Sequence, residues 1–288
     1  MNPNTHPSRQ DMPVFMDLKN DFAFKYILGH EKILIKLLND ILQKDIVEIQ
    51  YLPNELPVVS DKDKRAIFDV ICKNAAGEKF LVEMQSAPKS DMDDRLMFYG
   101  CSLVRNQVGR GDEIYELQPV YVLCIANYCR KHESETPGKL LFSYQFREEE
   151  TNELFGNQLG IYVLEVPRVE EIWSAAETDM ERWCCLFQNL SIFANVPEDA
   201  AGFDEVFAVS RVDELSETQI KDYKDAMLSE YEKRVIKEYA YKTGHEEGRA
   251  EGIAEGMSKG AEQMRESIKA RLEKLGLSQE LIDEALKA

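Results

Sequence analysis

Hydrophobic residues in the first half of the chain follow a helical spacing in some segments and a strand spacing in others. Apolar residues recur about every 3.6 positions over 17–43, which predicts a helix with a break at Gly29. A second helix is expected over 90–108, with Ser90 as its N-cap. Strands are expected at 47–52, 65–73, 79–85 and 119–126. The order α-β-β-β-α-β predicts an α/β layer fold with a mixed sheet.

The second half predicts further strands and helices, followed by a glycine-rich tail. Strands are expected at 140–146 and 160–166, and helices at 179–194 and 216–241. Glycine recurs every four residues from Gly244 to Gly260, and each glycine within a helix costs about 1 kcal/mol relative to alanine. The segment 243–261 is therefore either a weak, solvated helix or linker, or a glycine-lined helical face that another helix approaches closely. Two short amphipathic helices, 262–275 and 278–287, are expected to form a hairpin suited to assembly or partner binding.

Composition and charge narrow the class of protein. Hydrophobic residues make up 44% and charged residues 31% of the 288 residues, a balance typical of a globular protein with a packed core. No apolar run approaches the length of about 18 residues that a membrane span needs, so no membrane partner is expected. The net charge of −18 argues against non-specific binding to nucleic acid. However, residues 1–137 carry 17 Lys/Arg and 21 Asp/Glu, a net of only −4, so a function on DNA stays open there.

The chain lacks the motifs of several enzyme classes. It contains no P-loop, no G-x-S-x-G and no H-E-x-x-H sequence, and its four histidines are scattered. Its six cysteines show neither disulfide nor C-x-x-C spacing, and we expect reduced, mostly buried thiols in a cytoplasmic protein. If the chain is an enzyme, its chemistry is therefore expected to depend on carboxylates.

One predicted hairpin, 65–85, contains two carboxylates at matching positions. A three-residue loop at 75–77 places Gly77 where a type I turn with a G1 bulge needs a left-handed residue. This loop pairs Lys73 with Lys79, and the same register places Asp69 opposite Glu83 on one face of the sheet.

Opposed carboxylates repel each other and destabilise a sheet unless a positive charge lies between them. A hard divalent cation with oxygen ligands, Mg²⁺ or Mn²⁺, is the natural candidate for Asp69 and Glu83. Gln85 lies two residues further, on the same face, where it can hydrogen-bond a water or a phosphate oxygen. The alternative is that both acids simply lie on the solvated side of a half-exposed hairpin.

The same residues carry a family resemblance. Asp69 followed by Glu83-Met84-Gln85 on a hairpin between two helices resembles the core of PD-(D/E)XK nucleases. More closely, the chain resembles the Rpn family of recombination-promoting nucleases, also called PD-(D/E)XK family transposases. The matching pieces are KNDFAFKYILG at 19–29, the Asp69 strand, the VEMQ strand, RLMFYGCSLV at 95–104 and YELQPVYVLCI at 115–125.

The resemblance implies a restriction-endonuclease-like α/β core, with a mixed central sheet flanked by helices and a helical C-terminal extension. The expected organisation is a loose N-terminus at 1–14, a nuclease core at 15–135, completing strands and helices at 136–242, a Gly-periodic segment at 243–261 and a helical hairpin at 262–288. The implied activity is Mg²⁺-dependent cleavage of DNA, linked to recombination or mobile elements. Asp69 and Glu83 would bind the metal, and Gln85 would orient the attacking water.

This sequence departs from the superfamily pattern at Gln85, where lysine is usual, and at Phe68, where proline is usual. Lysine both positions the water and stabilises developing negative charge, whereas glutamine can only position the water. Lys25, within the family-like first helix, is therefore the expected replacement cation and a candidate DNA contact. A catalytically silent nuclease fold that acts as an interaction or assembly module is the alternative function.

The other candidate DNA contacts lie on the two helices. Lys25, Lys32 and Lys36 would form one stripe if the first helix ran through Gly29, and such a stripe could contact phosphates or be a solvated face. On the second helix Arg95 and Tyr99 share a face; they could hold phosphate and support the carboxylates, or be a surface arginine beside a packed tyrosine. The C-terminal helices are the expected site of homo-oligomerisation.

Overall fold

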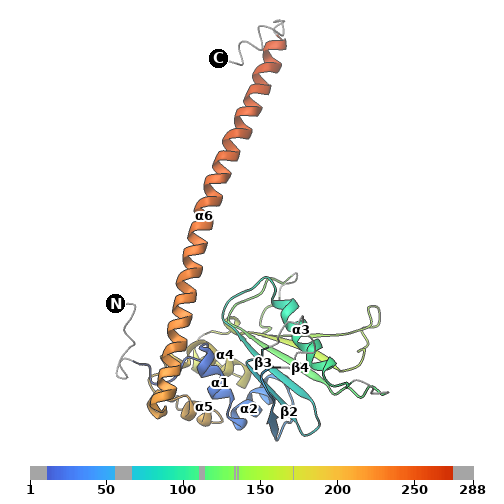
Figure 1. The fold of residues 1–288 in the computed structure, drawn as a ribbon, viewed down its shortest axis with the longest axis vertical. Coiled ribbons are helices and arrows are strands. Elements are labelled where there is room, and N and C mark those ends of the chain that lie inside the picture. The colour runs from blue at the N-terminus through green and yellow to red at the C-terminus, as the bar shows by residue number, and fades with distance from the viewer. Residues whose placement is uncertain are drawn as a thin grey trace. The chain divides into compact units, whose positions relative to one another are not determined.

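The computed structural model describes residues 12–55, 67–109, 114–132, 134, 136–170 and 172–274. The chain divides into two compact units, Met1–Met227 and Leu228–Ala288 (Figure 1). The first unit contains the sheet and the packed core, and the longest helix, α6 (Glu217–Lys274), begins in it and continues into the second unit. The described residues contain no helix that is long and apolar enough to cross a membrane.

The first unit is built on one six-stranded sheet of order β1-β2-β3-β4-β6-β5. The strands are β1 (Ile49–Tyr51), β2 (Val70–Asn74), β3 (Lys79–Gln85), β4 (Val120–Ala126), β5 (Leu141–Gln145) and β6 (Leu159–Glu165). Strands β3, β4 and β6 run parallel, whereas β1, β2 and β5 pair antiparallel with their neighbours. The predicted mixed α/β sheet is therefore confirmed.

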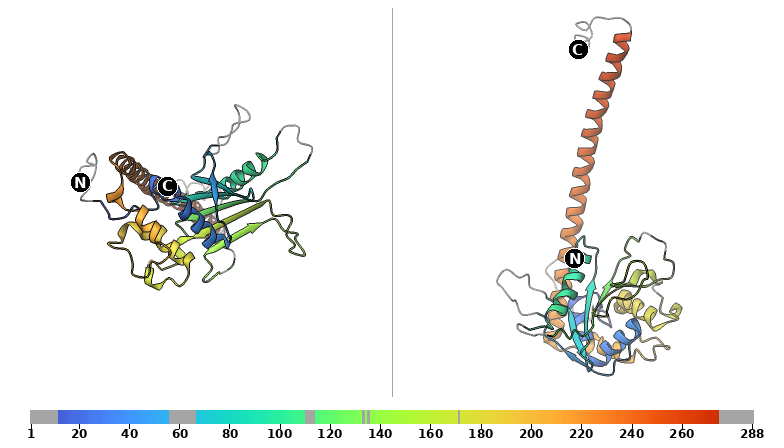
Figure 2. Two further views of the ribbon diagram at one scale, coloured as in Figure 1. Left: turned by 90° about the horizontal axis from the view of Figure 1, so that it is seen from below. Right: turned by 90° about the vertical axis from the view of Figure 1, so that its right-hand side faces the viewer.

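Helices cover both faces of this sheet (Figures 1 and 2). The helices of the first unit are α1 (Asp21–Leu28), α2 (Glu31–Leu42), α3 (Met92–Arg105), α4 (Asp179–Asn189) and α5 (Asp204–Val209). Buried side chains of α1, α2, α4 and α5 form the larger core with one face, and α3 forms a smaller core with β4 and β6 on the other. Strand β4 is buried along its whole length, as its continuous apolar run indicates.

The first predicted helix is divided in two, and its start was predicted too early. Helix α1 begins at Asp21, because Asn20 caps it and accepts hydrogen bonds from the N–H groups of Phe22 and Ala23. It ends at the predicted break, Gly29, and α2 starts two residues later at Glu31.

The start of α3 and the second half of the chain also differ from prediction. The N-cap of α3 is Asp91 rather than Ser90, and its carbonyl accepts the N–H of Arg95. Helix α4 ends at Asn189 and passes into a 3₁₀ turn, Leu190–Ile192. Helix α5 was not predicted at all, because six residues are too few to show a helical spacing.

The segment that precedes α1 is anchored to residues far along the chain. The Met16 N–H donates to the Ser210 carbonyl at 2.8 Å, and the Asp17 N–H donates to the Tyr223 hydroxyl at 2.9 Å. Phe15 is fully buried and packs edge-on against Phe207, with ring centroids 5.4 Å apart. The position of α1 therefore depends on residues 207–223.

The turn between β2 and β3 has the predicted geometry. Gly77 adopts φ +82°, and its N–H donates to the Asn74 carbonyl at 3.0 Å. The Asn74 N–H donates to the Glu78 carbonyl at 3.0 Å, so the three-residue loop closes as predicted.

Replacing Gly77 with alanine should destabilise the first unit by about 1–2 kcal/mol, because a β-carbon is strained in the left-handed region. The added carbon would also lie 3.3 Å from the Gln118 side chain. The measurement is the denaturant midpoint of Gly77→Ala, with Ala76→Gly as a loop control. A midpoint equal to that of the wild type would mean that the turn does not constrain the hairpin.

The glycine-rich segment is helical and belongs to α6, which is continuous to Lys274. A β-carbon added at Gly256 or Gly260 would meet nothing within 4 Å, so no contact with the part of the chain that the structure describes requires glycine there. Residues 262–274, which lie within the helix predicted at 262–275, continue α6 without interruption. The predicted helix 278–287 lies outside the described residues.

Candidate active site

Asp69 and Glu83 lie where β2 and β3 end their pairing. The ladder runs from Lys73↔Lys79 to Val70↔Val82, which is the predicted register. Asp69 stands immediately before β2, and its N–H donates to Glu83 Oε1 at 3.2 Å. In return, the Met84 N–H donates to Asp69 Oδ2 at 3.1 Å. Each acid is thus held by a backbone bond that crosses between the two chain segments.

The pair lies on the face of the sheet that α3 covers. Glu83 and Gln85 share this face with Leu81, which packs in the α3 core, and they are only 3% and 5% exposed. Their neighbours across β4 are Cys124 and Ala126, both fully buried. The alternative of a solvated hairpin face is therefore wrong for Glu83, while the Asp69 side chain is 23% exposed and marks the accessible end.

Ionisation of both carboxyl groups at the same time is unfavourable. Burial and then the neighbouring charge of Asp69 raise the pKa of the Glu83 carboxyl to about 8. Burial also raises the pKa of Asp69, although its hydrogen bond from Met84 and the charge of Lys25 act in the opposite direction. Because burial and mutual repulsion disfavour the ionised forms, an added cation would stabilise the ionised pair.

Lys25 extends from α1 to this pair. Its Nζ lies 3.7 Å from Asp69 Oδ1 and 2.7 Å from Asp21 Oδ1. Burial lowers the pKa of Lys25. The hydrogen bond and charge of Asp21, together with the charges of Asp69 and Glu83, raise this pKa by more, so the net shift is upward. Lys25 therefore remains charged beside Asp69.

Asp21 of α1 is a further member of this group, as the i,i+4 partner of Lys25. Its charge raises the pKa of Asp69, so the acid of α1 acts electrostatically on the hairpin acid. The signal available from the sequence was its position one helical turn before Lys25.

Arg95 and Tyr99 approach the pair from α3. Arg95 Nη2 donates to the Tyr99 hydroxyl at 3.0 Å, and the Tyr99 ring packs edge-on against Phe68 at 5.2 Å. Burial is the largest influence on the two hairpin carboxyls and raises the pKa of both. The positive charge of Arg95 acts in the opposite direction and lowers the pKa of both. The shared helical face predicted for Arg95 and Tyr99 therefore lies over the site.

The predicted lysine stripe does not form. Lys32 belongs to α2 and lies 3.7 Å from Glu205 of α5. Lys36 is bonded to Asp40 and Asp179 at 2.9 Å and lies over the Phe203 ring. The break at Gly29 changes the direction of the chain, so only Lys25 is brought to the carboxylates.

The arrangement suits a small hard cation at its open end. Asp69 and Glu83 supply carboxylate oxygens, the ligands that Mg²⁺ and Mn²⁺ prefer. Burial raises the pKa of both carboxyls, so a cation placed between them would favour their ionised forms. The described part of the chain contains no group of three or more His, Cys, Asp or Glu side chains placed to hold a metal. The remaining ligands would therefore be water and substrate oxygens, which is common for Mg²⁺.

The family assignment agrees with this geometry. A family model described as PD-(D/E)XK nuclease family transposase matches residues 18–240. The chain belongs to this PD-(D/E)XK family. The match includes α1, the hairpin and α3, the three elements that meet at Asp69 and Glu83. Membership of this family makes the chain a nuclease-related protein. Comparison of the chain with curated proteins and with solved structures gives no significant match.

The pKa of Glu83 predicts how stability changes with pH in the absence of metal. Because the folded state keeps a proton that the unfolded chain loses above about pH 4.3, stability should fall as the pH rises towards about 8. The slope should reach about 1 kcal/mol per pH unit. Thermal melts between pH 5 and pH 8 measure it.

Glu83→Gln should flatten this dependence, because the variant carries no titrating group at the position. Glu78→Gln is the matched control, since Glu78 lies on the same hairpin and its pKa is lowered rather than raised. An equally steep fall in Glu83→Gln and wild type would show that the dependence arises elsewhere.

Proposed function

We propose that this protein is a metal-dependent DNA endonuclease that hydrolyses phosphodiester bonds. The observation that carries the proposal is the carboxylate pair of Asp69 and Glu83. The Glu83 carboxylate accepts the backbone N–H of Asp69, and the Asp69 carboxylate accepts the backbone N–H of Met84. Membership of the PD-(D/E)XK nuclease family transposases supports the reaction class. We also propose a link to recombination or mobile elements, which the word transposase in the family description supports.

Each residue near the pair has a proposed role. Asp69 and Glu83 would hold Mg²⁺ or Mn²⁺, which when bound would supply positive charge against the scissile phosphate and lower the pKa of a water. Gln85, buried beside Glu83, orients the attacking water. Lys25 offsets the negative charge that develops on the phosphate, which is the part of the role of the usual superfamily lysine that glutamine cannot fill.

The proposed DNA contacts are Lys25, Lys32, Arg95 and Tyr99. Arg95 and Tyr99 stand over the site on α3, where a guanidinium and a phenol can both donate to phosphate oxygens. Lys32 is 81% exposed on α2 and would contact a phosphate farther from the cut. All six cysteines are free thiols, four of them buried, which supports a cytoplasmic location.

Plasmid cleavage by the full chain with Mg²⁺, with Mn²⁺ and without metal tests the proposal. We expect nicking in the presence of either ion and none in EDTA. The competing function is a catalytically silent nuclease fold that acts as an interaction module. It is favoured by Gln85 and by the absence of a third acidic metal ligand among the described residues. No cleavage with any metal, by a protein that is folded and binds DNA, would support that alternative.

We further propose that the C-terminal helical segment mediates self-association. Met257, Met264 and Ile268 of α6 are exposed at spacings of seven and four residues, so they follow one side of the helix. Truncation after Tyr241 should leave metal-dependent cleavage intact while reducing the oligomer size measured by light scattering. Complete loss of cleavage in a folded truncation would show that the removed segment is part of the active site.

A further inference from the structure

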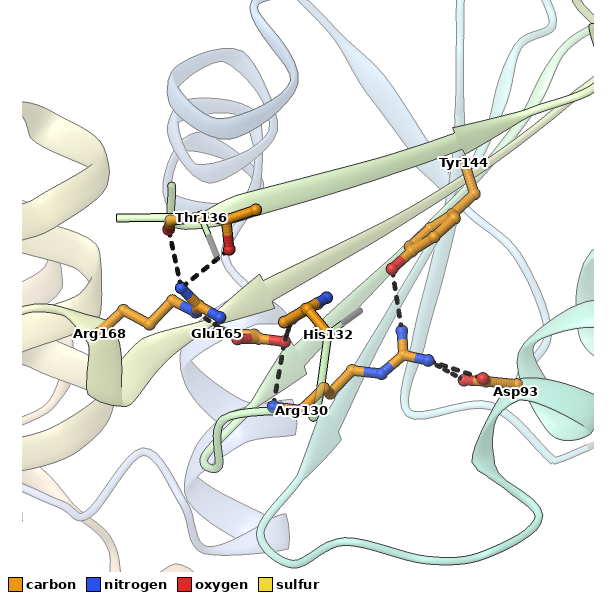
Figure 3. A network of polar contacts seen from close by, with 7 residues as sticks. All are labelled: Asp93, Arg130, His132, Thr136, Tyr144, Glu165 and Arg168. Atoms are coloured by element: carbon orange, nitrogen blue, oxygen red, sulfur yellow. Dashed lines mark hydrogen bonds and ion pairs between the residues drawn. The ribbon is translucent and has the colours of Figure 1, made fainter. Parts of the chain in front are cut away.

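A second polar cluster lies at the carboxyl end of β6, around Glu165 (Figure 3). Glu165 is fully buried, and its carboxylate forms an ion pair with Arg168. Glu165 Oε1 also lies 2.7 Å from His132 Nε2 and accepts the Arg130 N–H at 3.1 Å. A buried carboxylate is stable only when it is paired and fully hydrogen-bonded, and this one is.

This cluster lies at the carboxyl end of the parallel strands and on the same face of the sheet as the candidate active site. The parallel register aligns Gln85 with Ala126 and Ala126 with Glu165. Glu165 follows Ile161 and Val163, which pack in the α3 core, so it points to the α3 face as Glu83 and Gln85 do. Two strand spacings separate Gln85 from Glu165, a distance of about 10 Å.

Glu165 and Arg168 anchor the loop that follows β4. Glu165 holds the backbone of Arg130, and Arg168 donates to the carbonyl of Thr136 at 3.1 Å and to its hydroxyl at 3.3 Å. The His132 ring stacks on Phe142, with centroids 4.0 Å apart. The loop is therefore fixed at residues 130, 132 and 136, which also fixes where the Arg130 side chain starts.

The Arg130 side chain, unlike those of His132 and Arg168, does not bind Glu165 and points towards α3 (Figure 3). Its Nη2 donates to both oxygens of Asp93 at 2.7 and 2.6 Å, and its Nη1 donates to the Tyr144 hydroxyl at 3.3 Å. The Asp93 side chain is 71% exposed and that of Arg130 is 23% exposed, so water screens this ion pair from the Asp93 side and weakens it. A phosphate presents the same fork of oxygens to a guanidinium as a carboxylate does.

We propose that Arg130 binds a backbone phosphate of the DNA, in place of Asp93, a few nucleotides from the bond that is cut. This inference rests on the proposed endonuclease function and adds a phosphate site to it. A DNA strand carries a phosphate about every 3.4 Å of duplex axis. The separation of about 10 Å between the Gln85 and Glu165 positions, the second of which anchors the Arg130 backbone, therefore corresponds to a few nucleotides. Glu165 is a positioning residue in this site, and Asp93 occupies it when DNA is absent.

Equilibrium binding of fluorescein-labelled duplexes to the full chain in EDTA tests the proposal without depending on cleavage. Arg130→Gln should weaken binding by about tenfold, the size expected for one charge-assisted hydrogen bond. The loss of affinity should be equal for two duplexes of unrelated sequence. The slope of log Kd against the logarithm of the salt concentration should decrease by about one. Arg147→Gln is the matched control, since it removes the same charge from the arm beyond β5, where Arg147 binds Gln145 and the Asn152 carbonyl.

Asp93→Asn should have the opposite effect and tighten binding, because it removes the competitor of the phosphate. Asp94→Asn, one residue along α3, removes the same charge and should tighten binding less. Melting temperatures close to wild type confirm that the variants are folded. Arg130→Gln with unchanged affinity and salt slope, or a wild type without DNA binding, would overturn the proposal.

The result also separates this inference from the proposed function. Metal-dependent cleavage together with unchanged binding in Arg130→Gln would overturn the phosphate site alone. Absent cleavage together with weakened binding in Arg130→Gln would leave the phosphate site standing on a fold that binds DNA without cutting it.

Discussion

Asp69→Asn should strongly reduce DNA cleavage and, without metal, melt at a higher temperature than the wild type. The amide keeps an oxygen that accepts the Met84 N–H, so the bond between the segments is preserved. The substitution removes the charge that contributes to the raised pKa of Glu83, and the repulsion between the two acids disappears with it. Cleavage should fall by on the order of 10³-fold, because a ligand of the charge-stabilising ion is lost.

Divalent metal should distinguish the two proteins further. An ion that binds only the folded state stabilises it by about 2.7 kcal/mol at a hundredfold excess over its dissociation constant. Mg²⁺ or Mn²⁺ should therefore raise the melting temperature of the wild type and have little effect on Asp69→Asn. Glu48→Gln, an exposed acid just before β1, is the control and should behave as wild type in every assay. An Asp69→Asn variant that still cuts DNA would show that the pair is not the metal site.

Lys25→Met should lower cleavage by about 10²-fold, the size typical of losing one preorganised positive or donor group. Methionine keeps most of the unbranched side chain but removes the charge that lies 3.7 Å from Asp69. Adding Gln85→Lys to this variant should restore activity to within about tenfold of wild type, since it returns a cation to the position the superfamily uses. Single-turnover cleavage at saturating protein measures the chemical step for each variant.

The rescue separates a catalytic charge from a structural one. If Lys25 only stabilised the fold through Asp21 and Asp69, Gln85→Lys would not restore the rate. Lys32→Met is the matched control on α2, and it should change the KM for DNA more than it changes kcat. Full activity in Lys25→Met would assign the role of the missing superfamily lysine to another residue.

Local spacing was enough to predict the hairpin half of the site. Gly77 alone sets the loop length, and the loop length sets which residues of β2 and β3 face each other, so Asp69 and Glu83 could be paired from the sequence. The burial of Glu83 could not be read in this way. It depends on the parallel pairing of β3 with β4 and on the cover of α3, contacts between segments that are distant in sequence.

Contacts between distant segments also explain the failures. The lysine stripe looked continuous because the helical spacing passes through Gly29, but Lys36 is bound by Asp179, which no local pattern connects to it. The Glu165 cluster was missed for the same reason, since its members come from the end of β6, the loop after β4 and the edge strand β5. Each residue taken alone is an ordinary charged or aromatic side chain.

The anchoring of the chain before α1 has a consequence for protein synthesis. The segment that carries Met16 and Asp17 is held by Ser210 and Tyr223, which the ribosome makes among the last residues of the first unit. Helix α1, and with it Lys25, therefore reaches its final place only after nearly the whole unit has been translated. The hairpin acids can pair early, but a nascent or prematurely terminated chain lacks the positioned lysine beside them. Under the proposed function, a chain that ends before Tyr223 should therefore lack DNA cleavage even though it contains Asp69, Glu83 and Lys25.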